Sequence, residues 1–280
     1  MPTSATRDSL RRCPLCGREN SAGTHLPFAE DPWILRQCAG CGLVYLENPP
    51  PPQALEEDLA WEKTYYEERR RRREREPIFQ RLGAAVNFLR ARVLKRDKLS
   101  ALARRHFPHG HILDVGCSDG SALARLPAGY VPFGIEVSKV LCCMAEEIFS
   151  SRGGQCVRGD ALSGMREFAD ASFDGVLMMS YLEHEPNPRL ALEQAARLLK
   201  PGARLIIKVP NYACWNRAVR GARWCGFRSP EHVNYFTPSL LSRLVTDCGY
   251  QVRQFGFLDR LPTSDNMWLV AEKPAVEPRG

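Results

Sequence analysis

Two pairs of cysteines near the start of the chain have the spacing of a metal site. Cys13 and Cys16 form one C-x-x-C-G segment, and Cys38 and Cys41 form a second one, with 21 residues between the two pairs. A tetrahedral Zn²⁺ ion needs four such ligands on short turns, and the glycine after each pair lets backbone amides approach the thiolates. Because all four positions are cysteine and none is left for water, the spacing predicts a structural zinc ribbon. A redox dithiol is the alternative, although it would need only one pair beside a βαβ unit.

A second group of residues could hold a nucleotide-like ligand. The segment His111–Gly120 (HILDVGCSDG) indicates a strand that runs into a tight turn with Gly116 and Gly120. The next predicted strand ends at Glu136, 20 positions after Gly116, and a third ends at Asp160. Glycines allow close backbone approach to a ligand, and a carboxylate at the second strand can accept hydrogen bonds from ribose hydroxyls. An NAD site is disfavoured because the third glycine of G-x-G-x-x-G is absent.

Alternating strand and helix patterns are expected to position these residues. The apolar runs predict strands at 112–115, 131–137, 155–158, 173–179 and 204–209, and helices at 78–106, 121–125, 139–151, 188–199 and 238–248. Two final runs, 251–258 and 268–272, predict a hairpin at one edge of the sheet. This pattern predicts an α/β fold, a doubly wound and mostly parallel seven-stranded sheet, preceded by the small ribbon. The expected divisions are a ribbon at 1–48, a Pro- and charge-rich linker and arm at 49–77, and the α/β domain at 78–280.

The order of these motifs resembles the class I S-adenosylmethionine-dependent methyltransferases. The resemblance is carried by ILDVGCSDG, GIEVS, GDA, FDGVLMM and LLKPGARLIIKVPN, and it covers residues 78–280. It implies a Rossmann-like sheet with a reversed last strand, with S-adenosylmethionine as the cofactor. Ser118 stands where many members have glycine. The cofactor-binding residues that the resemblance implies are Asp114, Gly116, Cys117, Ser118 and Gly120 in the loop, Glu136 and Val137 at the ribose, Asp160 and Ala161 at the adenine, and Ser180 and Tyr181 beside the donor.

Two histidines are candidate general bases for methyl transfer. His184 follows the fourth predicted strand and His232 follows the fifth, so both belong at the carboxyl edge of the sheet, where ligands bind in such folds. His184 could instead tie its loop to the backbone. The stretch EHVNYFT is similar to a segment of zinc-containing methyltransferases that act on nucleotide-linked deoxysugars. That resemblance implies His232 as the base and Glu231 as its support.

The linker carries two further features. Tyr65 and Tyr66 could close over a donor or pack a linker helix. The run Arg69–Arg73, continued by Arg75, is flanked by glutamates, which favours a solvated helix over a phosphate contact.

Composition limits the class of protein further. Hydrophobic residues make up 44% and charged residues 25% of the 280, which is typical of a folded globular chain. We find no hydrophobic leader and no apolar run of about 18 residues, so we expect a cytoplasmic protein without a membrane span. The net charge of +7 allows an acidic partner.

Three functions remain open at this stage. The first is methyl transfer to a small-molecule acceptor, with a sugar or related secondary metabolite favoured, and zinc as a structural metal. The second is an RNA methyltransferase of the rRNA type, with the ribbon and the arginine run binding phosphate. The third is a non-catalytic zinc-containing binding protein that has kept the methyltransferase fold.

Overall fold

The computed structural model describes residues 10–19, 22–50 and 97–275. The tyrosine pair Tyr65–Tyr66, the arginine run and most of the expected helix at 78–106 lie outside these residues. Of that helix, the structure describes its end as α4, Lys98–His106.

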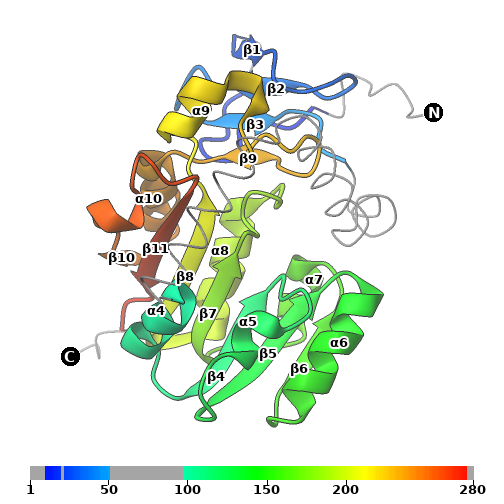
Figure 1. Cartoon of the computed structure of the whole chain (residues 1–280), viewed down its shortest axis with the longest axis vertical. Coiled ribbons are helices and arrows are strands. Elements are labelled where there is room, and N and C mark those ends of the chain that lie inside the picture. Colours follow the sequence, from blue (N-terminus) through cyan, green and yellow to red (C-terminus); the bar gives the residue numbers. More distant parts are fainter. Residues whose placement is uncertain (1–9, 20–21, 51–96, 276–280) are drawn as a thin grey trace.

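A seven-stranded sheet forms the larger part of the molecule (Figure 1). Its strand order is β10-β11-β8-β7-β4-β5-β6. All neighbouring strands from β6 to β8 pair in parallel, whereas β11 is antiparallel to both β8 and β10. The expected doubly wound, mostly parallel sheet with one reversed strand is confirmed. The strands are β4 (Gly110–Val115), β5 (Tyr130–Glu136), β6 (Gln155–Arg158), β7 (Phe173–Met179), β8 (Leu199–Pro210), β10 (Gln251–Gln254) and β11 (Asn266–Glu272).

Helices pack on both faces of this sheet because successive strand residues point to opposite sides. Leu113 packs in one core with helices α8 and α10, and its neighbour Ile112 packs in the other core with α4 and α6. Capping side chains define several helix starts; Ser138, for example, accepts a hydrogen bond from the backbone N–H of Leu141 at 3.3 Å. The remaining helices of the sheet domain are α5 (Ser121–Ala124), α6 (Lys139–Ser150), α7 (Ala161–Arg166), α8 (Pro188–Leu198) and α10 (Pro238–Asp247).

The final hairpin differs in one detail from its expected limits. The strand predicted for 251–258 ends at Gln254, and a 3₁₀ turn (η3, Phe257–Asp259) follows it. The carboxylate of Asp259 accepts hydrogen bonds from the backbone N–H of Gly256 and the side-chain amide of Gln254. This local polar turn explains why an apolar-looking run does not continue as a strand.

A second, four-stranded sheet contains the N-terminal segment. Its order is β1-β2-β3-β9, with strands β1 (Thr24–Leu26), β2 (Leu35–Gln37), β3 (Val44–Leu46) and β9 (Asn234–Tyr235). The sequence did not predict β9, because two residues carry no periodic signal. It also did not predict the short helix α9 (Trp215–Arg220), which lies beside this sheet in Figure 1. The segment that follows β8 therefore folds back and completes the small sheet.

The buried guanidinium of Arg11 joins this small sheet to the larger domain. Its Nε donates to the carbonyl of Leu46 in β3 at 2.7 Å, and one terminal nitrogen donates to the carbonyl of Pro186 at 2.7 Å. The other terminal nitrogen donates to the side chain of Asn234 in β9 at 3.1 Å. One side chain thus holds the ribbon against the loop after β7, which also lines the cavity described below. Among the residues that the structure describes, no helix is long and apolar enough to cross a membrane.

Candidate functional site

A cavity of about 790 Å³ lies at the carboxyl ends of the central strands, which is the usual ligand position in such sheets. Its wall comes from the loops after β4, β5, β6 and β7, together with the segment that leaves the ribbon. Residues on this wall include Pro49, Pro50, Asp114, Gly116, Cys117, Ser118, Glu136, Val137, Asp160, Ala161, Ser180, Tyr181, His184, Glu185, Asn187, Lys208 and Glu231. All but one of the cofactor-binding residues implied by the sequence are on this wall; Gly120 is the exception.

The turn after β4 has the left-handed backbone that its glycines allow. Gly116 and Gly120 have φ angles of +74° and +76°. Ser118, between them, also has a positive φ of +53°, so the serine adopts the conformation that glycine would take at lower cost. Its backbone N–H donates to a carboxylate oxygen of Glu136 at 2.9 Å. The loop thus keeps its shape despite the substitution.

Glu136 ends β5 as the sequence predicted, and it is 9% exposed. One carboxylate oxygen accepts the Ser118 N–H, and the other accepts the Ser138 N–H at 3.0 Å. A carboxylate has about four acceptor positions, so holding two amides is compatible with accepting hydrogen bonds from ligand hydroxyls. Its geometry thus fits a ribose.

Asp114 is a buried carboxylate at the end of β4, with 2% exposure. Its Oδ1 has no hydrogen-bond partner among the described residues. Burial raises the pKa of this carboxyl well above its usual range, and the nearby charge of Glu136 adds to the increase. A cationic ammonium group of a ligand would supply the missing partner. The amino-acid end of S-adenosylmethionine carries such a group, so the chemistry of this carboxylate is compatible with the cofactor.

The remaining implied residues surround the same space. Asp160 caps α7 by accepting the Ser163 N–H at 3.0 Å, and Ala161 is the first residue of that helix. Cys117 is 3% exposed, and its Sγ lies 3.5 Å from Sγ of Cys156 behind the loop. Ser180 has a φ of +56° and accepts a hydrogen bond from Nζ of Lys208 at 3.2 Å.

Tyr181 stands over the glycine turn. A Cβ built on Gly116 would lie 3.5 Å from its ring. The Tyr181 hydroxyl donates to Glu185, whose other oxygen accepts the Asn187 N–H at 2.8 Å. This chain of contacts fixes an aromatic wall beside the donor end of the cavity.

The two candidate histidines lie together, although only His184 lines the cavity. Their ring centroids are 4.7 Å apart and the rings are nearly perpendicular. Nδ1 of His184 contacts the carbonyl of Glu231 at 2.9 Å, and Nδ1 of His232 contacts the carbonyl of Gly226 at 2.8 Å. His232 is 5% exposed because the loop that contains Gly226 covers it. The sequence led us to expect His232 at the acceptor. In the structure His232 lies behind His184 and does not line the cavity. The carboxylate of Glu231 pairs with Arg228.

Sequence reasoning missed Glu183, which precedes His184. This residue is 1% exposed, and its Oε2 has no partner among the described residues. Burial raises the pKa of Glu183 to about 7, against the lowering effect of Lys208 and Arg228. Burial also lowers the pKa of His184 to about 4, with a further contribution from Arg228. The sequence signal was present in the run Glu183-His184-Glu185, but nothing in it indicated which carboxylate is buried.

The four paired cysteines come together as the spacing predicted. Their sulfur atoms all lie within 4.8 Å of one another. Sγ of Cys13 is 3.5 Å from Sγ of Cys41, and Sγ of Cys16 is 3.6 Å from Sγ of Cys38. Thiolates on one zinc ion, with bonds of about 2.3 Å, lie roughly 3.8 Å apart, so the donor set fits tetrahedral Zn²⁺.

Gly17 and Gly42, which follow the pairs, have φ angles of +70° and +77°. Their N–H groups donate to the carbonyls of Cys13 and Cys38. They therefore close the two turns.

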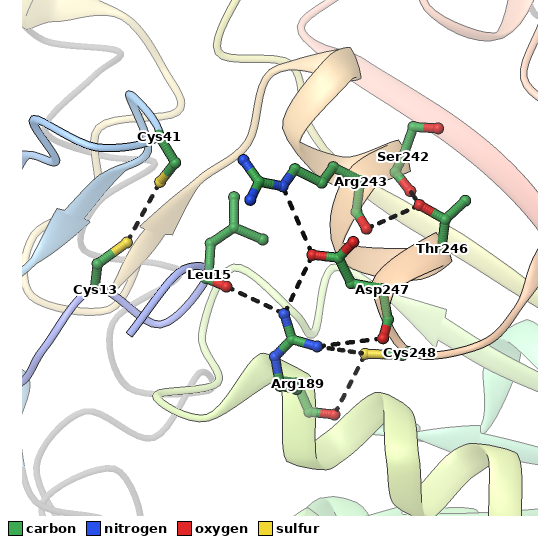
Figure 2. Close-up of polar contacts among 9 residues, drawn as sticks. All are labelled: Cys13, Leu15, Cys41, Arg189, Ser242, Arg243, Thr246, Asp247 and Cys248. Atoms are coloured by element: carbon green, nitrogen blue, oxygen red, sulfur yellow. Dashed lines mark hydrogen bonds and ion pairs between the residues drawn. The ribbon is translucent and has the colours of Figure 1, made fainter. Parts of the chain in front are cut away.

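One arginine connects the first cysteine turn to the sheet domain (Figure 2). The guanidinium of Arg189 in α8 donates to the carbonyl of Leu15, between Cys13 and Cys16, at 3.1 Å. It also forms an ion pair with Asp247 at the end of α10 at 3.4 Å. Arg189 thus links the turn that contains Cys13 and Cys16 to helices α8 and α10 of the larger domain.

The strand order, the glycine turn and the acidic strand ends together define a Rossmann-like methyltransferase. A family model described as a methyltransferase domain matches residues 87–254, and the chain belongs to that family. A solved S-adenosylmethionine-dependent methyltransferase from Aquifex aeolicus shares the fold, with a TM-score of 0.50 at 17% identity over 65% of this chain and 93% of its own. A methyltransferase-fold protein from Bacillus halodurans gives a TM-score of 0.51 at 15% identity, over 64% of this chain and all of its own.

Curated relatives are O-methyltransferases. ResE of Aspergillus sclerotiorum is 40% identical over 101 residues, which cover 35% of this chain and 38% of that protein. CnsE of Penicillium expansum is 33% identical over 153 residues, 52% of this chain and 51% of its own. The ubiquinone biosynthesis O-methyltransferase of Maricaulis maris is 28% identical over 199 residues, 64% of this chain and 78% of its own. The chain thus spans only 38% and 51% of the lengths of the first two relatives.

Proposed function

We propose that this protein transfers a methyl group from S-adenosylmethionine to a hydroxyl oxygen of a small molecule. One observation carries the proposal: the glycine turn and the carboxylates Asp114, Glu136 and Asp160 line a single cavity in a member of the methyltransferase-domain family. The names of the relatives, which are O-methyltransferases, support oxygen as the accepting atom.

Each part of the cavity has a role in this proposal. Asp114 and the turn at Gly116 hold the amino-acid end of the cofactor, and Glu136 holds its ribose hydroxyls. Asp160 and Ala161 bound the adenine, and Ser180 and Tyr181 lie beside the sulfonium. When bound, S-adenosylmethionine supplies an electrophilic methyl group. The chain's own contribution is to fix donor and acceptor in line and to exclude water.

The acceptor belongs at the end of the cavity lined by His184, Glu185, Asn187, Lys208 and Glu231. This end combines hydrogen-bond donors and acceptors at several angles, which suits a ring with several hydroxyl groups. We infer that the finer acceptor class is a sugar or a related hydroxylated metabolite.

His184 is the group that takes the acceptor proton. Because its Nδ1 faces the carbonyl of Glu231, the neutral ring carries its lone pair on Nε2. His232 packs edge-on against the same ring and acts as a positioning residue, in place of the base role that the sequence suggested. The backbone carbonyl of Glu231 accepts the hydrogen bond from Nδ1 of His184, and the carboxylate of Glu231 forms an ion pair with Arg228.

Zinc has a structural role in this proposal, bound by Cys13, Cys16, Cys38 and Cys41. With all four ligands from the chain, no position remains for a substrate. The segment that leaves the ribbon, Pro49–Pro50, lines the cavity. The ribbon module, residues 1–48, thus directs the start of the linker into the wall of the cavity in the domain at 78–280.

Methyl transfer from tritiated S-adenosylmethionine tests this function. The zinc-loaded protein is incubated with sugar nucleotides, phenols and total RNA in parallel, and the label is followed into each fraction. The proposal predicts label in an oxygen-linked methyl group of a small molecule. Label in RNA alone, with binding that weakens steeply as salt is raised, would contradict it.

A further inference from the structure

Three ligating side chains meet behind the cavity wall, away from the four cysteines. Glu183, His184 and His232 each place one ligand atom within 4.8 Å of the other two. Donor atoms on a single cation, with bonds of about 2.1 Å, lie at most roughly 4.2 Å apart, so small rotations of these side chains would complete a shared site. Two imidazoles and one carboxylate form a donor set that divalent transition metals take.

Both histidines are held in the tautomer that ligation requires. Their Nδ1 atoms face the backbone carbonyls of Glu231 and Gly226 at 2.9 and 2.8 Å, so each Nδ1 carries the proton in the neutral ring. Histidines that bind metals through Nε2 characteristically donate their other N–H to a carbonyl in this way.

The carboxylate supplies an independent observation. Glu183 is 1% exposed, and its Oε2 has no partner among the described residues. A buried carboxylate oxygen without a partner is costly unless it is protonated or paired with a cation. The positive groups whose charges reach it are Arg228 and Lys208, but Arg228 pairs with Glu231 and Lys208 donates to Ser180.

We propose that Glu183, His184 and His232 form a second metal site, which takes a divalent transition-metal cation such as Zn²⁺, Co²⁺ or Mn²⁺. It is distinct from the thiolate site in ligand chemistry and in place, since it lies between the loop after β7 and the loop before β9. A cation here adjoins the wall where His184 meets the acceptor end of the cavity.

The site also deepens the proposed function, and this part of the inference rests on that function. A cation at this wall would lower the pKa of a coordinated acceptor hydroxyl, so that its proton would pass to solvent water while the hydroxyl oxygen takes the methyl group and the methyl–sulfur bond of the sulfonium breaks. In the metal-free protein His184 takes that proton, as proposed above. While the cation is bound, the lone pair of His184 is engaged in coordination, and the cation replaces His184 as the activating group.

Cobalt titration of the zinc-loaded protein tests the site directly. Thiolate-bound Co²⁺ shows intense sulfur-to-cobalt charge transfer, whereas nitrogen- and oxygen-bound Co²⁺ shows only weak visible bands. The protein is loaded with one Zn²⁺ per chain, which fills the four-thiolate site first because thiolates bind Zn²⁺ more tightly. The proposal then predicts saturable weak bands at about one Co²⁺ per chain without thiolate bands, while the zinc content stays at one. Glu183→Gln, which preserves the shape of the side chain, is expected to weaken this binding at least about tenfold. His184→Ala gives the same loss by removing a ligand at the cavity wall.

The matched control is Glu193→Gln, an exposed carboxylate on α8. It should bind Co²⁺ like the unchanged protein, and circular dichroism confirms that all variants are folded. Absence of the weak bands, thiolate bands alone, or equal binding by Glu183→Gln and the unchanged protein would overturn the site. Calorimetry with S-adenosylhomocysteine on the same samples reads the donor cavity separately, so failure of the metal site and failure of the proposed function are distinguishable.

Discussion

At the scale of single residues, the fold leaves two buried carboxylates short of partners, Asp114 in the cavity wall and Glu183 behind it. Each has one oxygen without a hydrogen bond among the described residues. Such groups reduce the stability of the folded state unless a ligand satisfies them. We therefore place the amino-acid end of the cofactor at Asp114 and a metal cation at Glu183.

Glu183→Gln tests the electrostatics at the acceptor end. The folded-state pKa of Glu183, about 7, is higher than its ordinary value of 4.5. The unfolded chain therefore releases this proton first, and the contribution of Glu183 to stability is lost as the pH rises from about 4.5 to 7. The glutamine variant does not ionise, so its stability relative to the unchanged protein should rise over that window by up to about 3 kcal/mol. Urea unfolding at a series of pH values, without added metal, measures the difference.

Because His184 is present in both proteins, its own titration cancels in this comparison. Glu193→Gln should show no such pH dependence. A difference in stability that stays constant from pH 5 to 8 would mean that Glu183 is not held in a desolvated site.

His184→Ala tests the proton transfer. Loss of a general base typically slows turnover by about 10²- to 10⁴-fold, whereas the donor end of the cavity is untouched. We expect S-adenosylhomocysteine affinity to remain within a factor of about two while methyl transfer falls to this extent. Single-turnover assays with an accepted substrate give the rate. Turnover that survives in His184→Ala would refute its assigned role.

For single residues, the sequence predicted which residues lie near the cavity better than it predicted which side chains face it. The spacing of Gly116 and Glu136 sufficed to predict the donor loop, because strand periodicity fixes where those residues fall. His232 was expected to face the acceptor, yet the loop at Gly226 buries it. Burial of that kind depends on a long-range backbone contact, which no local pattern records.

At the scale of secondary structure, β5 and the turn after β4 depend on one another. Gly134 in β5 lies against Cys117 of the turn; a Cβ built there would lie 2.4 Å from Sγ of Cys117 and 2.7 Å from the ring of Phe149. The glycine is thus required for close packing of strand, turn and helix α6.

Gly134→Ala is expected to displace the donor turn. Overpacking of this kind costs typically 1–3 kcal/mol, and the moved turn should bind S-adenosylhomocysteine more weakly. Differential scanning calorimetry reports the stability. Gly159→Ala provides the comparison for stability, because its nearest contact, Oγ of Ser163, is 3.5 Å away. Equal melting temperatures for the two variants would contradict the packing argument.

Long periodic elements were predictable and short ones were not. The limits of β6 and β7 agree with the sequence analysis, since apolar runs bounded by turn residues are local signals. The strand β9 escaped prediction because its position depends on pairing with the distant strand β3. Helix α9 escaped prediction because its hydrogen bonds go to Pro262 and Asp265, which are also distant in sequence.

At the scale of the whole molecule, the cysteine-containing segment is joined to the sheet domain by side-chain hydrogen bonds and by strand pairing. Arg11 and Arg189 make hydrogen bonds across the junction, and β9 pairs with β3. The cluster of four cysteines could be predicted from their spacing alone. The position of this segment against the sheet domain could not, because that position depends on a strand contributed by residues more than 180 positions further on.

Removal of zinc by a chelator should destabilise the small sheet, both the N-terminal strands β1 to β3 and the strand β9 from the larger domain. We expect faster hydrogen exchange in β1, β2 and β3, and also in β9, because β9 pairs with β3 in that sheet. The amides of β4 and β5 should keep their protection, since the cores of the larger sheet remain. Mass spectrometry of exchanged peptides resolves these segments. Unchanged exchange at β9 would show that the ribbon does not support it.

The central claim is that the cavity at the carboxyl ends of β4 and β5 binds the methyl donor. Calorimetric titration of the zinc-loaded protein with S-adenosylhomocysteine, alongside Glu136→Ala, tests it most directly. The account predicts micromolar binding by the unchanged protein and a loss of roughly 1.5–3 kcal/mol in the variant, the scale of a hydrogen bond to a charged group. Absence of binding by the folded protein, or equal affinity of the two proteins, would contradict it.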